Sequence, residues 1–144
     1  MLIGGDLKIY ILFLIIFTLF IISCEDQIVS ECDLKEIETG LPANFSSIQN
    51  DVFSKSCATS GCHETISIPP DLSAGQAYNS IVNVMSFNPT FLYVYPGRSD
   101  SSYIIKKLRG VNIVGERMPL NDNPLFSADV DSIAAWIDRG ALNN

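Results

Sequence analysis

The chain has 144 residues, with 16 acidic against 9 basic side chains and a formal net charge of −7 at pH 7. This acidity argues against binding to nucleic acid and against electrostatic docking to anionic lipid, and it favours neutral or basic protein partners. The length suffices for a leader segment followed by one domain of about 100 residues.

Residues 1–23 have the pattern of a bacterial lipoprotein signal peptide. Lys8 precedes an apolar run over residues 9–22, and Ser23 stands directly before Cys24. The run is short for a membrane span of about 20 residues. Resemblance to bacterial lipoproteins implies that cleavage leaves a lipidated Cys24, which anchors the exported chain at the periplasmic face of a membrane or at the cell surface. An uncleaved signal anchor is the alternative.

Residues 24–44 are rich in Asp and Glu and poor in apolar side chains. Because so little apolar surface is available for burial, this segment is predicted to be a solvated, disordered tether. Cys32 lies within it and has no predicted role.

Residues 45–144 are predicted to form a small all-α domain of three to five short helices joined by long loops marked by Pro and Gly. The first helix is expected to begin with Ser46 or Ser47 as its cap. Its apolar residues fall on one face, namely Ile48, Val52 and Phe53. This helix leads directly into the sequence CATSGCH at residues 57–63.

Two cysteines followed by histidine form the motif that binds haem covalently, usually as C-x-x-C-H. Each thiol adds to a haem vinyl group, and the histidine ligates the iron. Here four residues separate Cys57 from Cys62 instead of two. These residues are small, so the loop can widen without moving either sulfur far from the porphyrin edge. The motif predicts haem c, with His63 as an iron ligand.

Two helices are expected to follow the motif. One comes after Pro70, with Ser73 as its cap and apolar residues at helical spacing: Ala77, Tyr78, Ile81 and Val82. The other starts near residues 99–101 and ends at Gly110, with apolar residues Ile104, Ile105 and Leu108.

Low-spin haem iron needs a second axial ligand, and His63 is the only histidine. A methionine thioether is the usual alternative. Met1 leaves with the signal peptide, and Met85 has apolar neighbours that suit a core residue. Met118 lies between Gly115 and Pro119, which favour an extended loop that can present sulfur to iron. Met118 is therefore the predicted distal ligand, ahead of Met85.

Basic residues gather just before and within this loop: Arg98, Lys106, Lys107, Arg109 and Arg117. Arg98 and Arg117 are the predicted partners of the haem propionates, with Tyr95 and Tyr103 as candidate hydroxyl donors. Lys106 and Lys107 are expected to form a solvated helix face.

The last helix is expected to begin with Ser127 as its cap and to end at Gly140. Its apolar residues recur at helical spacing: Val130, Ile133, Ala134 and Ile137. Trp136 lies beside this stripe, where it would cover the haem edge, pack on the first helix or serve as an ordinary core residue.

The order of C-x4-C-H, the sequence RMP and the carboxy-terminal WIDRGA resembles the small monohaem c-type cytochrome domains of bacterial lipoproteins, which are divergent class I cytochromes c. The resemblance covers residues 45–141. It implies thioethers from Cys57 and Cys62, axial ligands His63 and Met118, and first and last helices that cross over one haem edge. It further implies an electron carrier with redox protein partners, no enzymatic activity and no small-molecule substrate.

Three other interpretations of these residues remain open. A disulfide between Cys57 and Cys62 would make the chain a haemless helical lipoprotein that acts as an interaction module. A distal position without Met118 would indicate a haem enzyme or sensor. A zinc site would have to recruit Glu64 or Cys32, and it is disfavoured because adjacent Cys and His residues fit tetrahedral geometry poorly.

Overall fold

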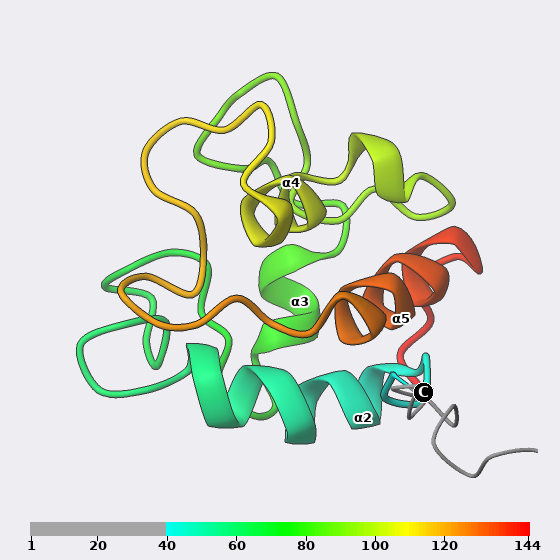
Figure 1. The fold of residues 1–144 in the computed structure, drawn as a ribbon, viewed down its shortest axis with the longest axis horizontal. Coiled ribbons are helices and arrows are strands. Elements are labelled where there is room, and N and C mark those ends of the chain that lie inside the picture. Colours follow the sequence, from blue (N-terminus) through cyan, green and yellow to red (C-terminus); the bar gives the residue numbers. More distant parts are fainter. Residues whose placement is uncertain (1–39) are drawn as a thin grey trace, which may run out of the picture. The chain divides into compact units, whose positions relative to one another are not determined.

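The computed structural model describes residues 40–144, and the predicted signal peptide, Cys24, Cys32 and most of the predicted tether lie outside the described residues. The described chain is built from short helices and long loops (Figure 1). Its only β pairing consists of two isolated bridges, Val82 with Val94 and Met85 with Leu92. The predicted all-α class is thus confirmed. No helix in this part of the chain has the length and apolar character needed to cross a membrane.

The first described helix, α2, spans Phe45–Ile48 and continues without a break into the π-helix η1, Gln49–Cys57. The predicted cap at Ser46 or Ser47 is wrong. Asn44 has an extended backbone, and its side chain accepts a hydrogen bond from the Ser47 N–H at 2.9 Å, so Asn44 is the cap. The next helix residues also have partners, because Asn144 accepts from the N–H groups of Phe45 and Ser46.

The domain begins before the predicted boundary at residue 45. The Leu41 N–H donates to the Asp129 carboxylate at 3.0 Å, and Arg139 donates to the Ala43 carbonyl. Leu41 and Ala43 also pack against the hydrophobic core. The last residues of the predicted tether therefore belong to the folded domain.

The second helix, α3, spans Ala77–Ile81 and is shorter than its apolar pattern suggested. Ser73 does not cap it with its side chain; Ser73 instead lies in a turn, where the Asp71 carboxylate accepts from its N–H and its hydroxyl. Val82 has left the helix for an extended conformation. The chain then forms the two isolated bridges.

The next two helices meet at Ser102, where the 3-10 turn η2, Ser99–Ser101, gives way to helix α4, Tyr103–Arg109. Gly110 ends α4 in the left-handed conformation, with φ +70°, as its sequence position predicted. Helix α5 spans Ser127–Asp138, so the predicted cap Ser127 lies inside the helix and Phe126 precedes it. Gly140 follows the end of α5 with φ +100°.

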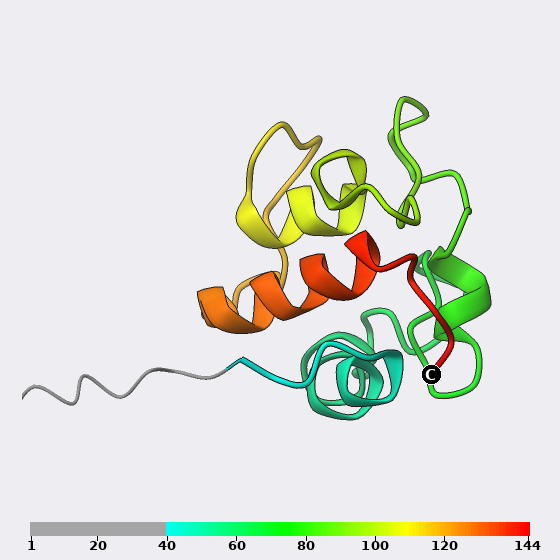
Figure 2. The same cartoon turned by 90° about the vertical axis from the view of Figure 1, so that its right-hand side faces the viewer.

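Helix α5 lies between α4 and α2 in both orthogonal views (Figures 1 and 2). Trp136 of α5 is only 1% exposed, its ring centroid lies 5.6 Å from that of Phe45, and its Nε1–H donates to the Leu142 carbonyl at 2.8 Å. Tyr78 of α3 completes this cluster with an edge-on contact to Phe45 at 5.1 Å. Trp136 therefore packs on the first helix, which was one of its three predicted positions, and joins the first and last helices.

Candidate haem-binding site

The CATSGCH sequence forms a closed turn at the end of η1. Cys57 is the last residue of η1, and its carbonyl accepts a hydrogen bond from the His63 N–H at 3.1 Å. Inside this turn the Cys62 N–H donates to the Thr59 carbonyl at 2.9 Å. Gly61 has φ +81°, a conformation that side chains with a Cβ rarely adopt. Ala58 packs against the core and residues 59–61 are exposed, while the two ends of the motif stay together.

The imidazole of His63 is held by backbone carbonyls of the following loop. Its Nδ1 lies 3.0 Å from the Ile68 oxygen and 3.1 Å from the Pro70 oxygen. Because a carbonyl oxygen can only accept, Nδ1 is the donor in both contacts. Histidines that bind metals almost always donate their second ring N–H in this way, because the bond fixes the tautomer and the ring orientation.

Two further hydrogen bonds link the backbone of His63 to Gln49 in η1 through Leu72. The His63 carbonyl accepts from the Leu72 N–H at 2.8 Å, and the Leu72 carbonyl accepts from Gln49 Nε2 at 3.1 Å. Gln49 is a buried residue of η1. Leu72, in the loop after the motif, is therefore hydrogen-bonded both to His63 and to Gln49 in the helix before the motif. Sequence reasoning missed Gln49, Ile68 and Pro70, and only the Pro69-Pro70 pair hinted at a fixed loop.

The two thiols of the motif differ in their surroundings. Cys57 is half-buried, Cys62 is exposed, and both are free thiols in this structure. Burial raises the pKa of the Cys57 thiol to about 11, and the neighbouring Cys62 charge adds to the rise. Within residues 40–144, no group of three or more His, Cys, Asp or Glu side chains is arranged to hold a metal ion.

The predicted distal ligand, Met118, lies in a loop that follows α4. Met118 is half-buried, and its N–H donates to the carbonyl of Lys107 in α4 at 3.0 Å. The loop after α4 lies on the same side of the domain as the loop after η1, at the left of Figure 1. Met85 is 57% exposed, so the interpretation of Met85 as a core residue is wrong.

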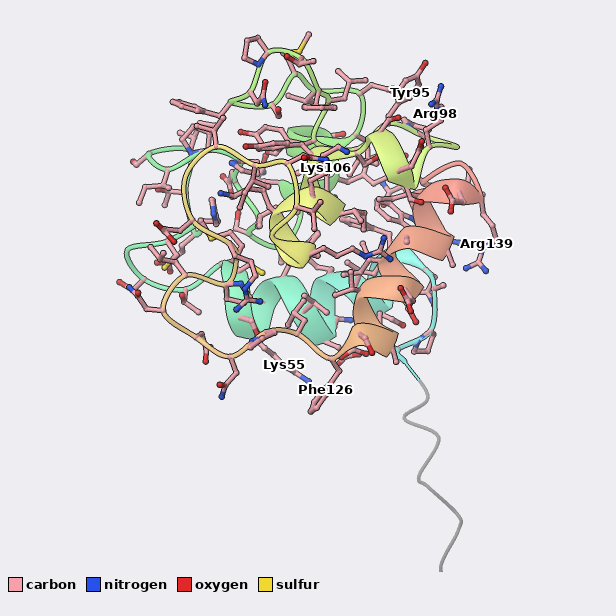
Figure 3. All side chains as sticks on the ribbon, turned by 45° about the horizontal axis from the view of Figure 1, so that its top comes forward. Lys55, Tyr95, Arg98, Lys106, Phe126 and Arg139 are labelled. Atoms are coloured by element: carbon pink, nitrogen blue, oxygen red, sulfur yellow. The ribbon has the colours of Figure 1, made fainter. Side chains whose placement is uncertain are left out.

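The two predicted propionate partners have different environments. The Arg117 side chain packs along Gly110, and its Nη1 is buried without a hydrogen-bond partner. Arg98 is exposed, lies 3.5 Å from the Asp100 carboxylate and stacks over the Tyr95 ring. Figure 3 shows Arg98 and Tyr95 near the carboxy-terminal end of α5, on the opposite side from the loop after η1. Arg117 therefore has one unpaired buried nitrogen, whereas Arg98 is already paired and lies away from the loop after η1.

The three basic residues of α4 each contact a specific partner. Lys106 Nζ lies 4.9 Å from the centre of the Phe91 ring, and Arg109 pairs with Asp131 at 2.8 Å. Lys107 Nζ donates to the Val114 carbonyl at 3.3 Å and to the Glu116 carbonyl. Lys106 and Lys107 are partly exposed, and each ammonium group also has a specific partner.

Comparisons of the chain with protein-family models, with curated proteins and with solved structures return no match. Two features of the residues bear on the predicted haem. His63 directs Nδ1 at two backbone carbonyls and follows a pair of free thiols. Arg117 has an unpaired buried nitrogen suited to a carboxylate.

Proposed function

We propose that the chain is a membrane-anchored monohaem c-type cytochrome that carries single electrons between periplasmic or cell-surface redox proteins. The observation that carries this proposal is the placement of the His63 imidazole, whose Nδ1 lies 3.0 and 3.1 Å from the carbonyl oxygens of Ile68 and Pro70. That arrangement is typical of a metal ligand, and it occurs directly after a pair of free cysteines. When bound, haem supplies a one-electron iron couple.

Each residue of the site would have a distinct task. Cys57 and Cys62 would form the two thioethers, and His63 would ligate the iron through Nε2. Met118 would provide the opposite ligand and favour the reduced state, since thioether ligation raises the potential. Arg117 would neutralise a propionate with its unpaired nitrogen. If His63 and Met118 both bound the iron, the site would have no place for a substrate, and the protein would serve as an electron carrier in preference to an enzyme.

The test is expression of the full chain, with its signal peptide, in a bacterium that has a cytochrome c maturation system. We expect a denatured protein band that stains for haem and a pyridine haemochrome spectrum typical of two saturated vinyl groups. Cys57→Ala and Cys62→Ala should each leave one thioether and shift that spectrum. Cys32→Ala is the matched control, because it removes a cysteine outside the motif and should leave the spectrum unchanged.

The mass of the mature protein distinguishes the cytochrome from the haemless, disulfide-containing alternative. A chain with lipid on Cys24 and haem on both motif cysteines supports the proposal and the anchor together. A mass that fits an internal disulfide between Cys57 and Cys62, without haem, would overturn the cytochrome in favour of a haemless interaction module. A haem-bearing chain recovered wholly in the soluble fraction would contradict the anchor alone.

A further inference from the structure

The loop that carries Met118, residues 111–118, contains no fully buried side chain. Val111 and Val114 are 54% and 61% exposed. Asn112 and Gly115 have positive φ angles of 54° and 72°. Since apolar burial cannot fix such a segment, its conformation depends on polar contacts with the neighbouring helix.

Helix α4 supplies these contacts from two residues one helical turn apart. The buried Tyr103 hydroxyl accepts from the Val114 N–H at 3.0 Å. Lys107 Nζ donates to the Val114 and Glu116 carbonyls. The Lys107 carbonyl, which has no partner within the last turn of the helix, accepts from the Met118 N–H at 3.0 Å. Lys107 thus binds the loop before the methionine with its side chain and the methionine itself with its backbone.

We propose that Lys107 is a positioning residue that fixes Met118 in the place required of a distal iron ligand, with Tyr103 as its helper. This inference rests on the proposed function, since it assigns a role toward the iron. The ammonium group acts as a donor to two carbonyls that lie on either side of Gly115, so it holds the bend that leads into Met118. A charged donor suits this role, because hydrogen bonds from charged groups are stronger than those between neutral groups.

The test compares Lys107→Met with Lys106→Met in the full-length, haem-loaded protein. Both changes remove one positive charge from α4, but the Lys106 ammonium lies over the Phe91 ring and the Lys107 ammonium binds the loop. Lys107→Met should weaken or abolish the near-infrared sulfur-to-iron absorption band and lower the midpoint potential. Lys107→Arg, which keeps charged donors, should restore most of the band. Lys106→Met should resemble the wild type in both measurements.

Hydrogen exchange supplies a second readout that does not depend on iron. Amides of residues 111–118 should exchange at least about tenfold faster in Lys107→Met, since this is the factor expected on losing even one of its two charge-assisted hydrogen bonds. Tyr103→Phe should accelerate the same amides. Amides of α5 should be unaffected in either variant, which shows that the domain remains folded.

The outcomes separate this inference from the proposed function. If the wild type carries haem, and Lys107→Met keeps the band, the potential and the exchange rates of the wild type, Lys107 does not position Met118. If the wild type carries no haem, the proposed function and the ligand role of Met118 both fail. Faster exchange in Lys107→Met would then mean that Lys107 holds the loop for a structural reason alone.

Discussion

In the haem-free chain, the Cys57 thiol should react with an alkylating reagent far more slowly than the exposed Cys62 thiol. Burial raises the pKa of Cys57 from an ordinary value of 9.0 to about 11. The thiolate is the reacting species, so its fraction at pH 8 falls from roughly 10% to roughly 0.1%, which is a loss of about 100-fold. Partial burial of the sulfur also hinders access of the reagent, which lowers the rate further.

The assay is timed alkylation with iodoacetamide, followed by peptide fragmentation that separates the two cysteines. The rate at Cys57 should rise about tenfold for each pH unit toward its pKa of about 11. In denaturant the two rates should converge, because unfolding removes the difference in burial. Similar rates at Cys57 and Cys62 in the folded chain would refute the argument from burial. A chain that resists alkylation at both residues until it is reduced contains the disulfide.

The same raised pKa makes a prediction for stability. The folded state favours the neutral Cys57 thiol, so its contribution is fully present below about pH 9 and is lost as the pH rises toward about 11. Two pKa units correspond to about 3 kcal/mol. The difference in unfolding free energy between the wild type and Cys57→Ala should therefore shrink between these pH values. A thioether has no proton to lose, so this dependence should disappear once haem is attached through Cys57.

Two further predictions concern the distal ligand and the core. In the oxidised, haem-loaded protein, Met118→Ala should abolish the near-infrared sulfur-to-iron band and lower the potential, whereas Met85→Ala should leave both unchanged; a band that survives in Met118→Ala would transfer the ligand role to another residue. Trp136→Ala removes a ring that is 1% exposed and contacts Phe45, so it should cost about 3 to 5 kcal/mol in urea unfolding. A cost under about 1 kcal/mol would show that Trp136 does not join the first and last helices.

The sequence predicted where the helices lie better than it predicted the residues that cap them. The apolar spacing of Ile133 and Ile137 and the position of Gly110 identified α5 and the end of α4, because burial and the left-handed conformation restrict residue types. Helices α3 and α5 have no side-chain cap at all, and the cap of α2 was wrong because Asn44, Ser46 and Ser47 can each accept the same hydrogen bond. Only the backbone distinguishes them, as the extended conformation of Asn44 shows.

The π-helix η1 was also beyond prediction. Val52 and Phe53 were assigned to one apolar face of an α-helix, and both are buried in the π-helix as well. Apolar spacing is a coarse signal, so it does not distinguish hydrogen bonds between residues four apart from those between residues five apart. The wider helix nonetheless determines where Cys57 lies, since Cys57 is its last residue.

In the candidate site, too, the residues with characteristic side chains could be predicted from the sequence and the backbone contacts could not. Cys57, Cys62 and His63 could be proposed from the sequence because the chemistry of haem attachment requires those residue types in one short segment. The carbonyls of Ile68 and Pro70 could not, because every residue has a carbonyl and the residue type carries no signal. Lys107 was assigned to solvent for a related reason, since its partners are also backbone oxygens.

The unusual spacing of the cysteines concerns the turn before His63 and not the loop after it. Thr59 and Gly61 lie in an exposed turn, and a Cβ at Gly61 would meet no atom within 4 Å, so this turn can vary in length without disturbing the core. The orientation of His63 is set instead by carbonyls on its other side, five and seven residues further along the chain. The His63 N–H also donates to the Cys57 carbonyl, so the backbone of His63 is tied to this turn while its imidazole contacts the later loop. In a longer turn the carbonyls of Ile68 and Pro70 would still face Nδ1 of His63, so we expect the wider spacing to act first on the Cys57 side of the motif.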